Sequence, residues 1–172
     1  MYPAVHAQSM PEKAAVIIGS DVLTYRELND RSNQCAQLFA ALGLVRDSAI
    51  ALFMKNGPDY FYATWGAQRS GLYYTPISTH FSAAETAYII DNCEAEVVVV
   101  SYELRDVALA IKDELPRVHT WLMVGGTVPG FDAFEERLDA FPAEPVPHEL
   151  EGCMMLYSSG TTGFPKGIKN VN

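Results

Sequence analysis

Two kinds of hydrophobic pattern alternate along the chain. The first kind is a short, nearly continuous apolar run, which predicts a buried strand. Such runs cover residues 14–19, 48–54, 72–75, 96–101 and 120–124. Four consecutive valines lie within the run at 96–101. A continuous β-branched run is typical of a strand that is buried on both faces, as in a parallel sheet.

The second kind places an apolar residue at every third or fourth position, which predicts an amphipathic helix. This spacing is followed by Tyr25, Leu28, Ser32, Cys35, Phe39 and Leu42, all of them apolar except Ser32, and the next residue is a glycine that can end the helix. Capping boxes mark two helix starts, Thr24 with Glu27 and Ser82 with Glu85. After the first helix, the predicted helices span about 58–70, 82–92, which begins at the second capping box, 104–115 and 131–140.

Strand and helix patterns in alternation predict a three-layer α/β fold, with a mostly parallel sheet, helices on both faces and right-handed crossovers. We divide the chain into three parts. Residues 1–141 form an N-terminal α/β subdomain, and residues 142–152, with three prolines and three glutamates, form an extended connector. Residues 153–172 form a hairpin with predicted strands at 153–157 and 167–171.

Composition narrows the class of protein. The net charge of −9 argues against a nucleic-acid-binding protein. We find no signal-peptide pattern and no apolar run of about 20 residues, so we expect no integral membrane segment. The three cysteines lie far apart, which fits small apolar residues in a reducing cytoplasm.

Several residues have ordinary structural interpretations. The four histidines lack the spacing of metal ligands, so we predict no metal site. Trp65 lies on a helical stripe and is predicted to be core. The aromatic residues 60–62 could line a ligand channel, although packing is the preferred interpretation. Glu135 and Glu136 are predicted to form a solvated helix face.

The candidate chemistry lies in residues 156–167. This stretch combines hydroxyl donors, glycines that allow close backbone approach, and one lysine, a set suited to phosphate oxygens. The predicted binding residues are Ser158, Ser159, Gly160, Thr161, Thr162, Gly163, Lys166 and Gly167. It is not a Walker A loop, because a proline precedes the lysine and a glycine follows it. Pro165 favours extended backbone before it, so we expect strand–loop–strand.

The string YSSGTTGFPKG resembles the signature phosphate loop of the adenylate-forming superfamily, which includes acyl-CoA synthetases, peptide-synthetase adenylation domains and firefly luciferase. LTYRELNDRSNQCAQLFAALGL and GAQRSGLYYTPISTHFSAAETAYIIDNCEAEVVVV are similar to two other blocks of that superfamily. The ISTHFSAAE stretch is most similar to acyl-CoA synthetases. The resemblance implies the N-terminal subdomain of the adenylate-forming fold.

The resemblance also implies a reaction. A fatty or related carboxylic acid attacks the α-phosphate of ATP with Mg²⁺, and coenzyme A then displaces AMP to give acyl-CoA. It assigns the loop residues to the β- and γ-phosphates, and Lys166 to catalysis. The family's adenine, Mg²⁺, carboxylate and coenzyme A sites are expected downstream.

Two alternatives remain open, an amino-acid-activating adenylation domain and a catalytically silent nucleotide-binding relative. We expect the 172-residue chain alone to be inactive. A bare sheet edge near its C-terminus would favour homo-oligomers.

Overall fold

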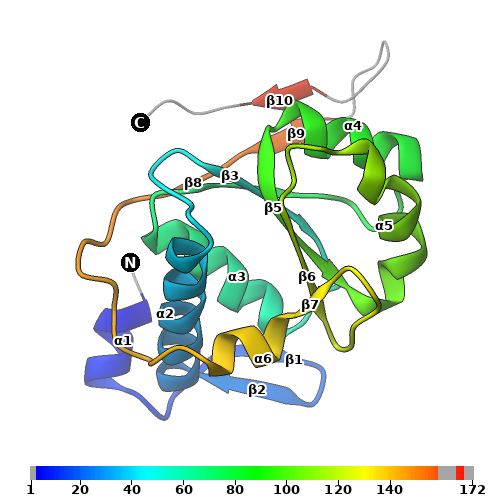
Figure 1. The fold of residues 1–172 in the computed structure, drawn as a ribbon. Coiled ribbons are helices and arrows are strands. Elements are labelled where there is room, and N and C mark those ends of the chain that lie inside the picture. Colours follow the sequence, from blue (N-terminus) through cyan, green and yellow to red (C-terminus); the bar gives the residue numbers. More distant parts are fainter. Residues whose placement is uncertain (1–2, 159–165, 169–172) are drawn as a thin grey trace.

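The computed structural model describes residues 3–158 and 166–168 of the chain (Figure 1). Its helices are α1 (Pro3–Ser9), α2 (Tyr25–Ala41), α3 (Pro58–Arg69), α4 (Ala83–Asn92), α5 (Arg105–Ile111) and α6 (Phe134–Asp139). Its strands are β1 (Ala14–Ile18), β2 (Asp21–Thr24), β3 (Ala49–Phe53), β4 (Tyr73–Pro76), β5 (Ala95–Ser101), β6 (Thr120–Val124), β7 (Asp132–Ala133), β8 (Cys153–Met154), β9 (Leu156–Ser158) and β10 (Lys166–Ile168). Short 3₁₀ turns flank α5.

Six strands form one parallel sheet in the order β7-β6-β5-β3-β4-β8. Helices α2, α3 and α6 lie on one face of this sheet, and α4 and α5 lie on the other (Figure 1). The predicted three-layer α/β fold with helices on both faces is therefore confirmed.

The central strand β5 explains why its sequence is continuously apolar. Val97 and Val99 pack with the α2, α3 and α6 layer, whereas Val98 and Val100 pack with the α4 and α5 layer. All four valines have no exposed surface. Neither side of the strand faces water, so the sequence shows no polar alternation.

Both predicted capping boxes are present. The Thr24 hydroxyl accepts a hydrogen bond from the Glu27 amide at 3.2 Å, and the Glu27 carboxylate accepts one from the Thr24 amide at 2.8 Å. Ser82 and Glu85 repeat this arrangement at the start of α4. After α2, Gly43 has a positive φ of 85°, a conformation that glycine adopts without strain. The two helix starts follow from side-chain chemistry within four residues.

Several predicted boundaries need correction. Residues 21–24 form β2, which pairs antiparallel with β1 outside the main sheet, and this hairpin was not foreseen. The helix predicted over 131–140 is shorter, because residues 132–133 pair with β6 as β7. The strand predicted at 153–157 is divided at Met155 into β8, which joins the sheet, and β9, which pairs with β10. In each case a backbone pairing partner overrides the local pattern.

The predicted connector runs along α2 without forming a helix or strand of its own. Three side chains of α2 hold the start of the connector and the residue before it: Asn33 donates to the carbonyl of Ala143, Gln34 to that of Phe141, and Gln37 to those of residues 142 and 144. At its far end the chain enters β8, which pairs with β4. The division at 141 and 153 remains a prediction.

In the part of the chain that the structure describes, no helix has both the length and the apolar character needed to cross a membrane.

Candidate functional site

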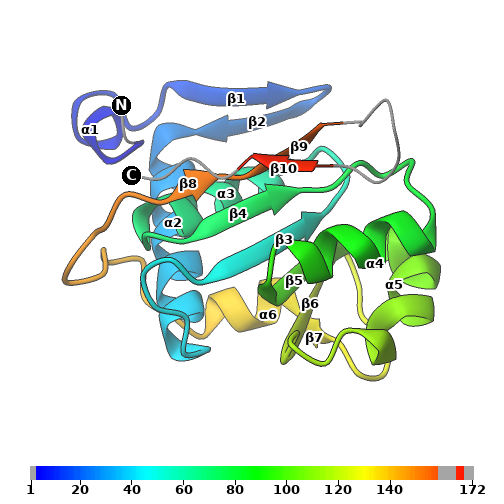
Figure 2. The same ribbon diagram turned by 90° about the horizontal axis from the view of Figure 1, so that it is seen from above.

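The hairpin of β9 and β10 frames the candidate phosphate loop. Ser158 pairs with Lys166, Tyr157 with Gly167, and Leu156 with Ile168, in antiparallel register. A strand therefore lies on each side of residues 159–165, whereas these residues and residues 169–171 of the second predicted strand lie outside the described residues. β9 leads toward the side of the molecule on which β4 ends (Figure 2). The carboxyl edge of a parallel sheet is where α/β proteins usually bind ligands.

The segment of β8 and β9 is anchored by two backbone hydrogen bonds, one to the residue before β4 and one to β4 itself, and by one side-chain bond to α4. The amide of Cys153 donates to the Leu72 carbonyl at 2.9 Å, and that of Met155 donates to the Tyr74 carbonyl at 3.0 Å. The Tyr157 hydroxyl donates to Asn92 Oδ1, at the end of α4, at 2.6 Å. Burial raises the pKa of Tyr157, so its hydroxyl stays protonated and can donate. The loop therefore starts from a strand tied to two elements.

Gly167 has a structural reason to be glycine. A Cβ at this position would lie 2.8 Å from the Tyr157 ring and 2.6 Å from the end of the Met155 side chain. Such contacts are too close for any other residue without a shift of the aromatic ring. The backbone of β10 therefore lies directly against the anchored tyrosine.

The predicted site residues divide into two groups. Lys166 and Gly167 lie in β10, where both are exposed, and the backbone of Ser158 ends β9. The predicted residues Ser159, Gly160, Thr161, Thr162 and Gly163 lie outside the described residues. The pairing of Ser158 with Lys166 nonetheless places both ends of the predicted loop side by side.

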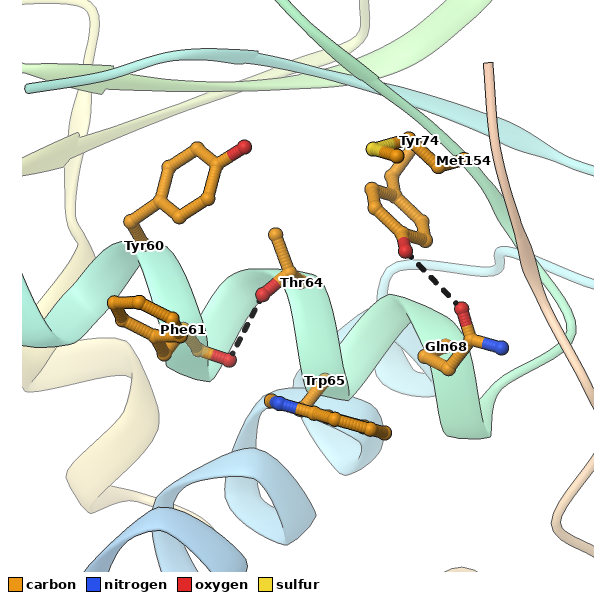
Figure 3. A pocket seen from close by; sticks show the side chains of 7 residues that line it. All are labelled: Tyr60, Phe61, Thr64, Trp65, Gln68, Tyr74 and Met154. Carbon is orange, nitrogen blue, oxygen red and sulfur yellow. Dashed lines mark hydrogen bonds between the residues drawn. The ribbon is translucent and has the colours of Figure 1, made fainter. Parts of the chain in front are cut away.

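A separate apolar pocket lies between α3 and the strands β4 and β8 (Figure 3). Its volume is about 230 Å³. Seven residues line it: Tyr60, Phe61, Thr64, Trp65, Gln68, Tyr74 and Met154. The Tyr74 hydroxyl donates to Gln68 Oε1 at 3.2 Å across one end. Burial raises the pKa of Tyr60 and of Tyr74, so both rings remain neutral.

This pocket corrects the interpretation of Trp65 as a core residue. The buried face of α3 consists of Ala63, Gly66, Ala67 and Arg69, whereas Trp65 is only half-buried and lines the pocket. The α2–α3 contact needs small residues, because a Cβ on Gly66 would lie 2.6 Å from the Cys35 Cβ. The stripe of large residues on α3 therefore faces away from α2.

A small polar crevice lies where the sheet topology changes direction, and no local sequence signal indicates it. Helix α3 follows β3 on one face and α5 follows β5 on the other, so the chain diverges between these neighbouring strands. The crevice, of about 140 Å³, includes Lys55, Asp59 and Ser101. Burial raises the pKa of Asp59, and Glu135 raises it further.

Glu135 is not the purely solvated residue that the sequence suggested. It is half-buried, and its carboxylate accepts a hydrogen bond from the Gly125 amide at 2.7 Å. The described residues contain no group of three or more His, Cys, Asp or Glu side chains placed to hold a metal ion.

The three cysteines are free thiols. Cys35 and Cys93 are buried, and Cys153 is half-buried at the start of β8. Burial raises the pKa of the Cys35 thiol well above its usual value and that of Cys93 to about 11. Both buried thiols are therefore neutral, as expected for small core residues.

Known proteins resemble this chain along nearly its full length. Long-chain fatty acid transport protein 6 of Mus musculus is 32% identical over 170 residues, covering 94% of this chain and 28% of that protein. The long-chain-fatty-acid–CoA ligase FadD13 of Mycobacterium tuberculosis is 31% identical over 156 residues, covering 87% and 30%. Bacitracin synthase 3 of Bacillus licheniformis is 29% identical over 167 residues, which is 94% of this chain but 2% of that protein.

A solved structure also matches this chain along nearly its full length. The inhibitor-bound N-terminal domain of FACL13 from Mycobacterium tuberculosis superposes with a TM-score of 0.85 at 28% identity, covering 96% of this chain and 42% of that one. The chain thus spans less than a third of the length of the fatty acid transport protein and of FadD13. The family described as AMP-binding enzyme matches residues 4–169. The fold, the β9–β10 hairpin and the sequence all match those of this family, and the chain belongs to this adenylate-forming family of AMP-binding enzymes.

Proposed function

We propose that this chain is the N-terminal part of an ATP-dependent acyl-CoA synthetase. The whole enzyme joins a fatty or related carboxylic acid to coenzyme A, with ATP converted to AMP and pyrophosphate through an acyl-adenylate. Its partners are these small molecules. The three free thiols support a cytoplasmic location.

One observation carries the proposal: the donor-rich string from Ser158 to Gly167 begins and ends on a paired hairpin. In the first half-reaction a carboxylate oxygen attacks the α-phosphorus, and the bond to the bridging oxygen of pyrophosphate breaks. Negative charge then accumulates on the leaving pyrophosphate. Hydroxyl and amide donors of this string stabilise that charge.

Lys166 supplies the positive charge of this string. It is exposed in β10, directly opposite Ser158, so its side chain is free to extend to a phosphate at the end of the hairpin. The ammonium group binds the outer phosphates in the ground state and gains interaction energy as pyrophosphate leaves. Mg²⁺, when bound to the nucleotide, would neutralise further phosphate charge.

The resemblance to FadD13 favours coenzyme A as acceptor and a fatty acid as substrate. The resemblance to bacitracin synthase 3 supports a second candidate, an adenylation domain that activates an amino acid. Both share the first half-reaction and differ in the acid and in the acceptor thiol. A silent nucleotide-binding relative would carry out neither step.

The test uses the whole protein that contains this chain. ATP–pyrophosphate exchange is measured with a panel of fatty, aromatic and amino acids, and thioester formation is then measured with coenzyme A. The proposal predicts exchange dependent on an added fatty or aromatic acid, followed by acyl-CoA formation. Exchange stimulated only by amino acids would instead favour the adenylation domain, and no exchange with any acid would indicate a silent relative.

A further inference from the structure

Arg69, at the end of α3, is the only charged residue with a fully buried side chain among the residues that the structure describes. Removing a guanidinium from water is costly, so a buried arginine needs compensating partners. Asn29 Oδ1 of α2 accepts from both terminal nitrogens of Arg69 at 3.4 and 3.5 Å. The Glu149 carboxylate lies 3.7 Å from one of them.

Glu149 belongs to the connector, four residues before β8 begins at Cys153. Its side chain is 36% exposed, so one end of the ion pair reaches the surface while the other is enclosed. The ion pair therefore joins the last segment of the connector to the α2–α3 layer. It draws this segment toward the buried end of α3.

Backbone contacts continue the attachment toward β8. The Leu150 amide donates to the Arg69 carbonyl at 3.0 Å, and the Gly152 amide donates to the Gln68 carbonyl at 2.6 Å. Ser70 and Leu150 form an isolated parallel bridge. The connector thus pairs with the last residues of α3 immediately before β8 pairs with β4.

Two glycines make this passage narrow. A Cβ on Gly152 would lie 2.6 Å from the carbonyl oxygens of Ala67 and Leu72. A Cβ on Gly71, which has a positive φ of 72°, would lie 2.8 Å from the Leu150 side chain. The backbone of Gly152 therefore lies against the backbone of residues 67 and 72, whereas Gly71 lies against the Leu150 side chain. A slip by one residue would bring an additional side chain into this space.

We propose that Arg69 is a positioning residue, which acts through Glu149 to hold residues 149–152 against α3 and so sets the register of β8 on β4. Because β8 has two residues and leads directly into β9, this register sets where the candidate phosphate loop begins. The link between this register and the phosphate loop rests on the proposed function, whereas the register of β8 on β4 does not.

The first test is amide hydrogen exchange of the chain without ligands, comparing Glu149→Gln with the unchanged protein. The substitution keeps the shape of the side chain but removes the charge that faces Arg69. We expect exchange of the Gly152, Cys153 and Met155 amides to accelerate about tenfold, and that of β5 to change by less than about twofold. Glu151→Gln, at an exposed carboxylate two residues away, is the matched control and leaves all rates unchanged.

Equal acceleration of amide exchange in β5 and β8, or no acceleration in either, would overturn the proposal.

The second test uses the whole enzyme in ATP–pyrophosphate exchange. Glu149→Gln and Arg69→Met should raise the KM for ATP several-fold and lower kcat/KM by at least as much, because a displaced loop weakens both the ground-state binding of the outer phosphates and the stabilisation of the leaving pyrophosphate. Arg69→Lys should recover part of the loss.

A lowered kcat at unchanged KM would contradict the positioning role. If Arg69→Met does not fold, Glu149→Gln still tests the positioning role, because the Glu149 side chain is partly exposed and its substitution leaves the buried core intact. Local acceleration of exchange in a protein that activates no acid would support the register and refute the proposed function, so the two can fail separately.

Discussion

At the scale of single residues, side-chain chemistry decides where helices begin. Thr24 and Glu27 exchange hydrogen bonds at the start of α2, and Ser82 and Glu85 do so at the start of α4. Hydrogen bonds from Thr24 lower the pKa of Glu27, the bond from the Thr24 amide contributing most. A carboxylate with a lowered pKa stabilises the fold above its unfolded pKa, and the contribution is lost as pH falls through its folded pKa.

Thr24→Ala should therefore lower the free energy of unfolding by about 1 kcal/mol at neutral pH, because the N-terminal cap loses its side-chain acceptor. Urea unfolding monitored by circular dichroism measures the loss. The difference between the two proteins should shrink as the pH falls through the lowered pKa of Glu27, because this carboxylate then becomes protonated. Equal stability at neutral pH would mean that the cap does not hold α2.

At the scale of elements, packing depends on residues that leave room for a neighbour. Gly66 on α3 allows Cys35 of α2 to approach, and both helices then cover the same face of the sheet. The sequence shows the stripe of large residues on α3 more clearly than the small face that is buried. For this reason the large face, including Trp65, was assigned to the core, although it lines a pocket (Figure 3).

Gly66→Ala tests this helix contact. The added Cβ would lie 2.6 Å from the Cys35 Cβ and 2.9 Å from its sulfur, so the two helices must separate. Overpacking of this kind costs about 1–3 kcal/mol. Thermal unfolding should show the loss. Full stability of Gly66→Ala would show that the α2–α3 contact is loose.

Most of the fold could be predicted from sequence, because the strands β3, β5 and β6 are short apolar runs and α2 and α4 carry caps. What could not be predicted depends on contacts between distant segments. β7 exists because β6 lies beside it, and β8 separates from β9 at Met155 because their pairing partners differ. The phosphate loop is indicated by its residue types. The apolar pocket joins α3 to β4 and β8, so the sequence indicates only its aromatic part at residues 60–62 and not the contribution of Tyr74 and Met154.

At the scale of the whole molecule, apolar side chains remain exposed on β8 and on the β9–β10 hairpin. Met154, Leu156 and Ile168 are 40%, 50% and 58% exposed, and Leu156 and Ile168 face each other across the hairpin. We call these three residues the hairpin patch. It adjoins the apolar pocket through Met154. Adjacent exposed apolar surface favours association between copies of a chain.

The isolated chain should therefore form dimers or larger assemblies at high concentration. Leu156→Ser combined with Ile168→Ser should shift it toward monomer, as measured by light scattering after size exclusion. The matched control is Ile17→Ser with Val22→Ser, an exposed cross-strand pair on the separate β1–β2 hairpin. A monomeric chain, or equal effects of both double substitutions, would argue against the hairpin patch.

The most direct measurement of the central claim is ATP–pyrophosphate exchange by the whole enzyme with Lys166→Ala. If Lys166 stabilises the leaving pyrophosphate, exchange should fall about a hundredfold, while thioester formation from added acyl-adenylate stays unchanged. Lys169→Ala, a neighbouring lysine outside the signature string, should retain near-normal exchange. Unchanged exchange together with a slowed thioester step would contradict the assignment of this hairpin to ATP.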